Sequence, residues 1–166
     1  SERAKAAGAA VEVDISTLKP GEMQTVEWRG KPVWILKRTP EQLESLKKTD
    51  SQAADPNSDR TQYPTPDYAK NVHRSIKPEF FVGVGICSHL GCSPSDKLQP
   101  GAQPSLPDDW QGGFLCPCHG STFDLAGRGY NVQSWGMGRN VGFQRRHAEA
   151  LEQKVRHVHH QTGKKV

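Results

Sequence analysis

CSHLGC at residues 87–92 and CPCHGS at residues 116–121 contain all four cysteines of this 166-residue chain and two of its seven histidines. Thiols and imidazoles concentrated in two short loops predict a metal site, because such a site needs ligands held on rigid elements that face each other. Gly91 and Gly120 give the two loops the backbone freedom that tight turns require. The two motifs are therefore the point from which the rest of the chain is interpreted.

The number of candidate ligands argues against a single zinc ion. Four cysteines together with His89 and His119 would make six ligands, whereas a structural zinc site takes four. Two cysteines and two histidines match a [2Fe–2S] centre in which imidazoles replace thiolates on one iron, and two cysteines are then available for a disulfide. Zinc binding, or two plain disulfides with incidental histidines, are the alternatives that the pattern leaves open.

The segments before the motifs predict mostly β-structure. Residues 80–86 form an apolar run, interrupted only by glycine, that is typical of a buried strand leading directly into the first motif. Residues 24–36 predict a hairpin with its turn at residues 29–31. Apolar residues alternate with acidic ones over residues 11–15, which indicates a further strand.

One short helix is expected in this first part of the chain. Thr39 is a candidate N-cap, Pro40 suits the first helical position, and Gln42 completes a capping box. The polar, proline-rich residues 49–78 that follow predict a long surface loop.

Composition and charge narrow the function classes. Hydrophobic residues make up 34% of the chain, the mean hydropathy is −0.74, and no apolar run approaches the roughly 20 residues of a membrane-spanning helix. The formal net charge of +4 is uneven, since residues 1–128 hold 15 basic and 16 acidic side chains and residues 129–166 hold 7 and 2. A diffuse basic tail without a phosphate-binding loop, a zinc finger or an RNA-binding motif argues against a nucleic-acid partner.

The paired motifs resemble the cluster-binding boxes of the Rieske iron–sulfur proteins of cytochrome bc complexes (ubiquinol–cytochrome c reductase), of the proteobacterial kind. The likeness extends from residue 11 to about residue 128. It implies one Rieske-type [2Fe–2S] cluster as cofactor. By matching position, the implied metal ligands are Cys87, His89, Cys116 and His119, and the implied disulfide joins Cys92 to Cys118. The resemblance also implies that Ser121 donates to a cluster sulfur. It implies that Leu90 and Gly91 form an apolar collar around the histidines, which contacts the quinone pocket.

The implied disulfide separates this resemblance from the wider superfamily. Rieske ferredoxins and ring-hydroxylating oxygenases keep the ligand spacing but generally lack the two additional cysteines. A disulfide also implies a site that faces an oxidising compartment. The cysteine count thus favours the respiratory branch of the family.

The resemblance implies an all-β fold, an antiparallel Rieske-type β sandwich with a small cluster-binding subdomain at its tip. We expect a flexible hinge or tether over residues 1–10, a first part of the base domain over 11–85, the cluster-binding subdomain over 86–127, and a second part of the base over 128–166. The C-terminus is atypical, because charge, proline and histidine content all change after residue 128. A genuine unusual terminus, a frameshift near residue 129 and an appended tail remain open.

The function implied is that of an electron-transfer subunit of a quinol–cytochrome c reductase. It would take an electron, with a coupled proton, from a quinol and pass the electron to a c-type cytochrome haem, with His119 and His89 taking direct part. Implied partners are a cytochrome b subunit, a c-type cytochrome and the membrane, through an N-terminal anchor absent from this chain. The implied location is the inner membrane, with the head on its periplasmic side. The alternatives are a soluble Rieske-type carrier for an oxygenase and a zinc-stabilised binding module.

Overall fold

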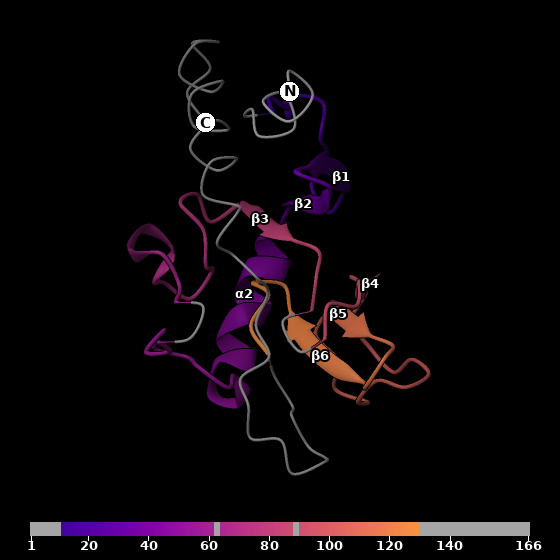
Figure 1. Cartoon of the computed structure of the whole chain (residues 1–166). Coiled ribbons are helices and arrows are strands. Elements are labelled where there is room, and N and C mark those ends of the chain that lie inside the picture. Colours follow the sequence, from indigo (N-terminus) through magenta and orange to yellow (C-terminus); the bar gives the residue numbers. More distant parts are fainter. Residues whose placement is uncertain (1–10, 62–63, 88–89, 130–166) are drawn as a thin grey trace.

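The computed structural model describes residues 11–61, 64–87 and 90–129, and their strands form two antiparallel three-stranded sheets (Figure 1). The sheet orders are β1-β2-β3 and β4-β5-β6. None of the helices in these residues is long and apolar enough to cross a membrane. The prediction of an all-β fold is confirmed, with one α-helix beside the sheets. The elements are β1 (Met23–Trp28), β2 (Lys31–Lys37), α2 (Pro40–Thr49), the 3₁₀ turns Asp50–Gln52 and Asp67–Ala69, β3 (Phe80–Val84), β4 (Ser95–Lys97), β5 (Gly113–Cys116) and β6 (Ser121–Asp124).

The predicted first hairpin is present, but its turn is shorter than predicted. Strand β1 pairs with β2 so that Trp28 lies opposite Lys31, which leaves only Arg29 and Gly30 in the turn. Both turn residues have positive φ angles, 51° and 71°. A two-residue turn in which both residues have positive φ matches the twist of the paired strands. Glycine is common in such turns, because it adopts positive φ without strain. Lys31 therefore belongs to the strand and not to the turn.

Strands β2 and β3 of the first sheet are buried on both faces. In β2, Val33 and Ile35 belong to one hydrophobic cluster, while Trp34 and Leu36 belong to a second cluster on the opposite face. Every residue of β3 is buried as well. Burial on both faces explains why these segments are continuous apolar runs and not alternating ones. The sheet is thus the middle layer of the molecule.

Residues 11–15 cover one face of this sheet without forming a strand. Val13 and Ile15 are buried in the first hydrophobic cluster, and Glu12 and Asp14 are exposed. No ladder involving these residues is formed within the part of the chain that the structure describes. The prediction of a strand here was wrong, although the alternation that suggested it does separate buried from exposed side chains.

The second hydrophobic cluster joins the two sheets and the helix. Trp34 of the first sheet stacks on Phe114 of β5, with ring centroids 4.8 Å apart, and Leu46 of α2 packs into the same cluster. The predicted capping box is confirmed: Gln42 donates its backbone N–H to the Thr39 hydroxyl, and Thr39 donates its own to the Gln42 side chain. The capping box at Thr39 therefore determines where the helix starts. It packs where its apolar residues meet both sheets.

The segment 49–78 is not the purely superficial loop that its polarity suggested. Arg38, which is buried just after β2, fixes this segment by donating to the carbonyl oxygens of His73 and Pro78 and to the hydroxyl of Ser75. The same guanidinium donates to the carbonyl oxygen of Leu125, just beyond β6. One buried cation thereby ties the loop and the second sheet to the first sheet.

His73 should make the stability of the fold dependent on pH. Burial, and secondarily the positive charge of Arg38, lower the pKa of His73 below its usual 6.5. The unfolded chain therefore takes up a proton at a higher pH than the folded chain, so the free energy of unfolding should fall as the pH drops below 6.5. Above pH 6.5, His73 does not contribute to the dependence of the free energy of unfolding on pH.

Urea unfolding of the wild type and of His73→Gln, between about pH 7.5 and about pH 5.5, measures this contribution. All other titrating groups are common to both proteins. The variant should lose less stability on acidification, and parallel pH profiles would contradict the assignment.

Candidate metal centre

The two cysteine motifs fold into matching turns. The carbonyl oxygen of Cys87 accepts a hydrogen bond from Gly91 N–H at 3.0 Å, and that of Cys116 accepts one from Gly120 N–H at 2.9 Å. Both glycines have positive φ, 85° and 72°, and a Cβ added to either would have no neighbouring atom within 4 Å. Their role is therefore conformational, because a left-handed backbone strains any other residue. Each turn begins at a cysteine predicted to bind metal.

A disulfide links the two turns. Cys92 and Cys118 are bonded, with Cα atoms 6.6 Å apart, which confirms the pairing that the resemblance implied. The backbone N–H of Cys87 donates to the carbonyl oxygen of Cys92 at 2.7 Å, closing the first turn. Ser93 then donates from its hydroxyl to the carbonyl oxygen of Gly85 at 3.1 Å. The first turn is thus held at both of its ends.

The two cysteines outside the disulfide are buried in the interior of the protein. Cys87 and Cys116 are each only 1% exposed and pack in the second hydrophobic cluster, together with Phe114 and Phe123. Cys116 ends β5, where it pairs with Ser121 of β6, and Cys87 follows β3 closely. A strand from each sheet therefore delivers one buried thiol to the site.

The sulfur of Cys116 lies beside the disulfide. The Sγ atoms of Cys92, Cys116 and Cys118 are all within 4.8 Å of one another. Three sulfurs at this spacing resemble a metal site, but two of them are bonded to each other and offer no thiolate. This trio therefore differs from the predicted ligand set, of which only Cys116 is a member.

The remaining predicted site residues lie on the surface. His119 and Gly91 are exposed, Ser121 is half-buried, and Leu90 is 69% exposed, an unusual position for a large apolar side chain. His89 lies outside the described residues, so its part in the site stays a prediction. The hinge over 1–10 and the chain beyond residue 129 also lie outside them. The described ligand candidates thus divide into buried thiols and an exposed imidazole.

A buried ion pair, which sequence reasoning missed, holds the second sheet against α2. Arg128 donates from Nε to Asp124 at 2.8 Å and from Nη2 to the carbonyl oxygen of Leu46 at 2.8 Å, near the end of α2. Asp124 also accepts the hydroxyl of Thr49. The only sequence signal was the pair of opposite charges four residues apart in a segment otherwise apolar and glycine-rich.

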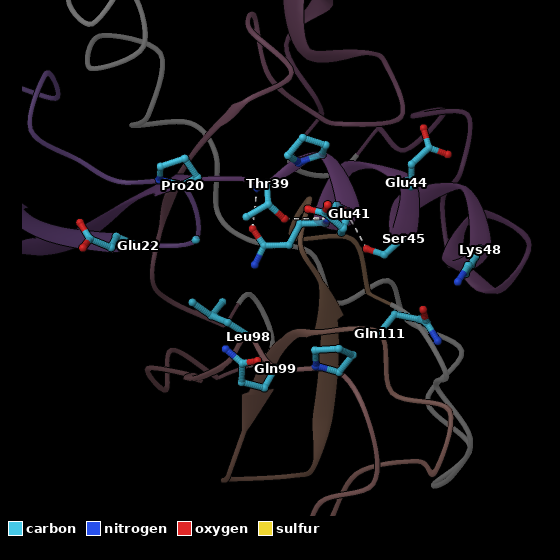
Figure 2. A pocket seen from close by; sticks show the side chains of 14 residues that line it. Pro20, Glu22, Thr39, Glu41, Glu44, Ser45, Lys48, Leu98, Gln99 and Gln111 are labelled. Atoms are coloured by element: carbon cyan, nitrogen blue, oxygen red, sulfur yellow. Dashed lines mark hydrogen bonds between the residues drawn. The ribbon is translucent and has the colours of Figure 1, made fainter.

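A groove of about 880 Å³ lies elsewhere, between the start of α2 and the segment after β4 (Figure 2). Figure 2 shows Leu98 and Gln99 across from Thr39 and Glu41. Neither His119 nor any cysteine lines the groove, so it is not the candidate metal centre. Its lining residues are Pro20, Gly21, Glu22, Thr39, Pro40, Glu41, Gln42, Glu44, Ser45, Lys48, Leu98, Gln99, Pro100 and Gln111.

Comparison with known proteins gives one family. The family described as "Rieske [2Fe-2S] domain" matches residues 9–136. The "Ubiquinol-cytochrome c reductase iron-sulfur subunit" of Allochromatium vinosum is 56% identical over 128 residues, which cover 77% of this chain and 60% of that protein. The "Cytochrome b-c1 complex subunit Rieske-3, mitochondrial" of Nicotiana tabacum is 39% identical over 122 residues, covering 72% of this chain and 37% of that protein.

The chain thus spans between about a third and three-fifths of the length of these relatives. Among solved structures, a chain of "Hyperthermophilic respiratory Complex III" matches with a TM-score of 0.45 and 21% identity, covering 86% of this chain and 72% of that one. A likeness at that level supports no conclusion about function.

Proposed function

Because the chain belongs to the Rieske [2Fe-2S] domain family, we propose that it is the electron-transfer head of a quinol–cytochrome c reductase. In this role it takes one electron and a coupled proton from a quinol and passes the electron to a c-type cytochrome haem. The observation that carries the proposal is the disulfide between the two motif turns. It accounts for the two cysteines that a four-ligand Rieske centre does not need.

The residues present suit such a cluster. Two thiols are buried: Cys116 ends β5 of the second sheet, and Cys87 follows β3 of the first sheet. His119 is exposed on the turn that starts at Cys116. We assign the two thiols and the imidazoles of His119 and His89 as ligands. When bound, the cluster supplies a one-electron acceptor at a higher potential than an all-cysteine centre.

The residues of the site have different roles, according to how deeply each is buried. The apolar cluster around Cys87 and Cys116 excludes water from the thiolate side. The exposed His119 presents its imidazole to a quinol, whose hydroxyl proton a ring nitrogen accepts. Leu90, at the same end of the molecule, covers the apolar ring of the quinol. The hydroxyl of Ser121, next to the second motif turn, would donate to a cluster sulfur.

The relatives' names support a proposal for the assembly. The relatives are called subunits of ubiquinol–cytochrome c reductase or of the cytochrome b-c1 complex. We propose that this chain likewise works in such a membrane complex, against a cytochrome b and a c-type cytochrome subunit, with the head on the periplasmic side. Within it we propose residues 86–127 as the cluster-binding subdomain, residues 11–85 and 128–166 as the base, and residues 1–10 as the tether.

Substituting Leu90 by Asn tests the proposed quinol contact. In a cytochrome bc complex that carries this chain as its iron–sulfur head, the rate of cytochrome c reduction by ubiquinol should fall about tenfold or more. This is what losing the burial of one leucine, about 1.5–3 kcal/mol, predicts. The visible circular dichroism of the cluster should not change, because Leu90 is not a ligand.

Val72→Asn is the matched control. Val72 is the other exposed large apolar residue of the described chain, 37% exposed, and lies in the segment before β3. This variant should keep the wild-type rate. Equal slowing by both variants, or no slowing by Leu90→Asn, would refute the proposed contact.

The composition of the purified protein decides between this proposal and the two alternatives. Equimolar iron and acid-labile sulfide exclude a zinc-stabilised binding module, whereas a colourless protein containing zinc would overturn the redox proposal. A soluble carrier for an oxygenase would hold the cluster but would not support quinol-dependent reduction of cytochrome c. The disulfide argues against that carrier, since only the respiratory branch is expected to have it.

A further inference from the structure

We propose that Cys116 is the nucleophile of an internal thiol–disulfide exchange, which moves the bridge from Cys92–Cys118 to Cys92–Cys116 whenever the cluster is not bound. The inference goes beyond the proposed function and does not depend on any quinol chemistry. It concerns only the three sulfurs that the fold brings together. Its consequence is that a protein that loses its cluster also loses a ligand.

Proximity is the first step of the argument. The Sγ atom of Cys116 lies within 4.8 Å of both sulfurs of the bridge. Its backbone is fixed by pairing with Ser121 and by the hydrogen bond from Gly120 N–H. Thiol–disulfide exchange proceeds by attack of a thiolate on a disulfide sulfur, and a thiol fixed beside that sulfur makes the attack unimolecular. Cys87, the other cysteine outside the bridge, does not belong to this group of sulfurs.

The exchange is balanced within the protein. The Cys116 thiol gives up its proton, and its Sγ forms a bond with the Sγ of Cys92. The bond between Cys92 and Cys118 breaks, and its electron pair leaves with the sulfur of Cys118, which takes up a proton. One disulfide and one thiol are present before and after, so no oxidant or reductant is needed.

Exposure selects which sulfur leaves. Cys118 is exposed, whereas Cys92 is half-buried and packs against the second hydrophobic cluster. Water stabilises a thiolate that leaves at the surface, and a more stable leaving thiolate departs faster. The new bridge still joins the two motif turns, so the fold keeps its cross-link. What changes is that a buried thiol is replaced by an exposed one.

Alkylation with N-ethylmaleimide detects this change. The full chain, purified with its disulfide and its cluster, is stripped of iron by a chelator under argon and labelled without denaturant. Acid digestion and fragment ions that split the chain at Pro117 distinguish label on Cys118 from label on Cys116. We expect label on Cys118, and a Cys92–Cys116 bridge in the same molecules. Protein that keeps its cluster should show neither.

Cys116→Ser and Cys87→Ser are the matched pair of variants. Each removes one buried thiol outside the bridge, but only the first removes the nucleophile. Labelling of Cys118 should be at least about tenfold slower in iron-free Cys116→Ser than in iron-free Cys87→Ser, because exposed thiols react faster than buried or bridged ones. Far-ultraviolet circular dichroism checks that both variants are folded.

Two outcomes would overturn the proposal. One is an intact Cys92–Cys118 bridge in folded, iron-free wild type, with label confined to Cys87 and Cys116. The other is equal labelling of Cys118 in both variants. If Cys116→Ser does not fold, the bridge found in folded wild type and in Cys87→Ser decides alone. Neither outcome bears on electron transfer, so failure here leaves the proposed function untouched.

Discussion

Replacing Arg128 by methionine should lower the free energy of unfolding by about 3–5 kcal/mol, a large part of the roughly 5–15 kcal/mol that stabilises a typical domain. The side chains of Arg128 and Asp124 are 3% and 1% exposed. Methionine fills similar space but leaves the Asp124 carboxylate buried without its cation. It also removes the donor to the carbonyl oxygen of Leu46 at the end of α2. Urea unfolding of iron-free protein measures the loss.

Two controls isolate the buried charge. Adding Asp124→Asn to Arg128→Met should recover part of the stability, since the amide oxygen can still accept the backbone N–H groups of Ala126 and Arg128 that Asp124 accepts. Lys47→Ala breaks an ion pair with Glu44 whose side chains are 70% and 66% exposed. Exposed pairs contribute about 0–1 kcal/mol. If Arg128→Met cost no more than Lys47→Ala, the ion pair would not hold the sheet to the helix.

The parts of the fold that depend on neighbouring residues could be predicted from the sequence. The capping box at Thr39 involves side chain and backbone three residues apart, and the buried strand β3 is a continuous apolar run. The hairpin was also predictable, but its turn was not. Whether Lys31 is paired depends on the register of β1 against β2, which composition alone does not determine.

The parts that depend on distant partners could not be predicted. The side chain of Arg38 donates to carbonyl oxygens 35, 40 and 87 residues away, and nothing near it in the sequence reveals them. Residues 11–15 show strand periodicity because one of their sides packs on a sheet, not because they pair with one. Periodicity reports which side chains are buried and does not report what the backbone bonds to.

The candidate site also combines features that could be predicted from the sequence with features that could not. The motifs supplied the candidate ligands, and the structure shows that Cys87 and Cys116 are buried while His119 is exposed. The pairing of Cys92 with Cys118 came only from the family resemblance, because four cysteines allow three pairings. The approach of Cys116 to that bridge came only from the structure. His89 remains a prediction from the motif.

Removing the disulfide, by Cys92→Ala together with Cys118→Ala, should release the iron and lower the free energy of unfolding of the iron-free chain by about 3.5 kcal/mol. The estimate follows from the loop that the bridge closes in the unfolded chain, whose ends are 26 residues apart. Iron should be lost because the backbone hydrogen bonds of the described residues in the two motif turns each lie within one turn and do not join the turns. Iron per chain after gel filtration and urea unfolding are the two measurements.

Ser93→Ala provides the control for a local change beside the first turn. It removes one hydrogen bond, from the Ser93 hydroxyl to the carbonyl oxygen of Gly85, and leaves the bridge intact. Its cost should be about 1 kcal/mol, with iron retained.

The double variant should also unfold with a steeper dependence on urea, because an unfolded chain without a cross-link exposes more surface. If the double variant kept its iron and its stability, the disulfide would not be what aligns the two turns. The cluster would then have to be held by the strands β3, β5 and β6 alone.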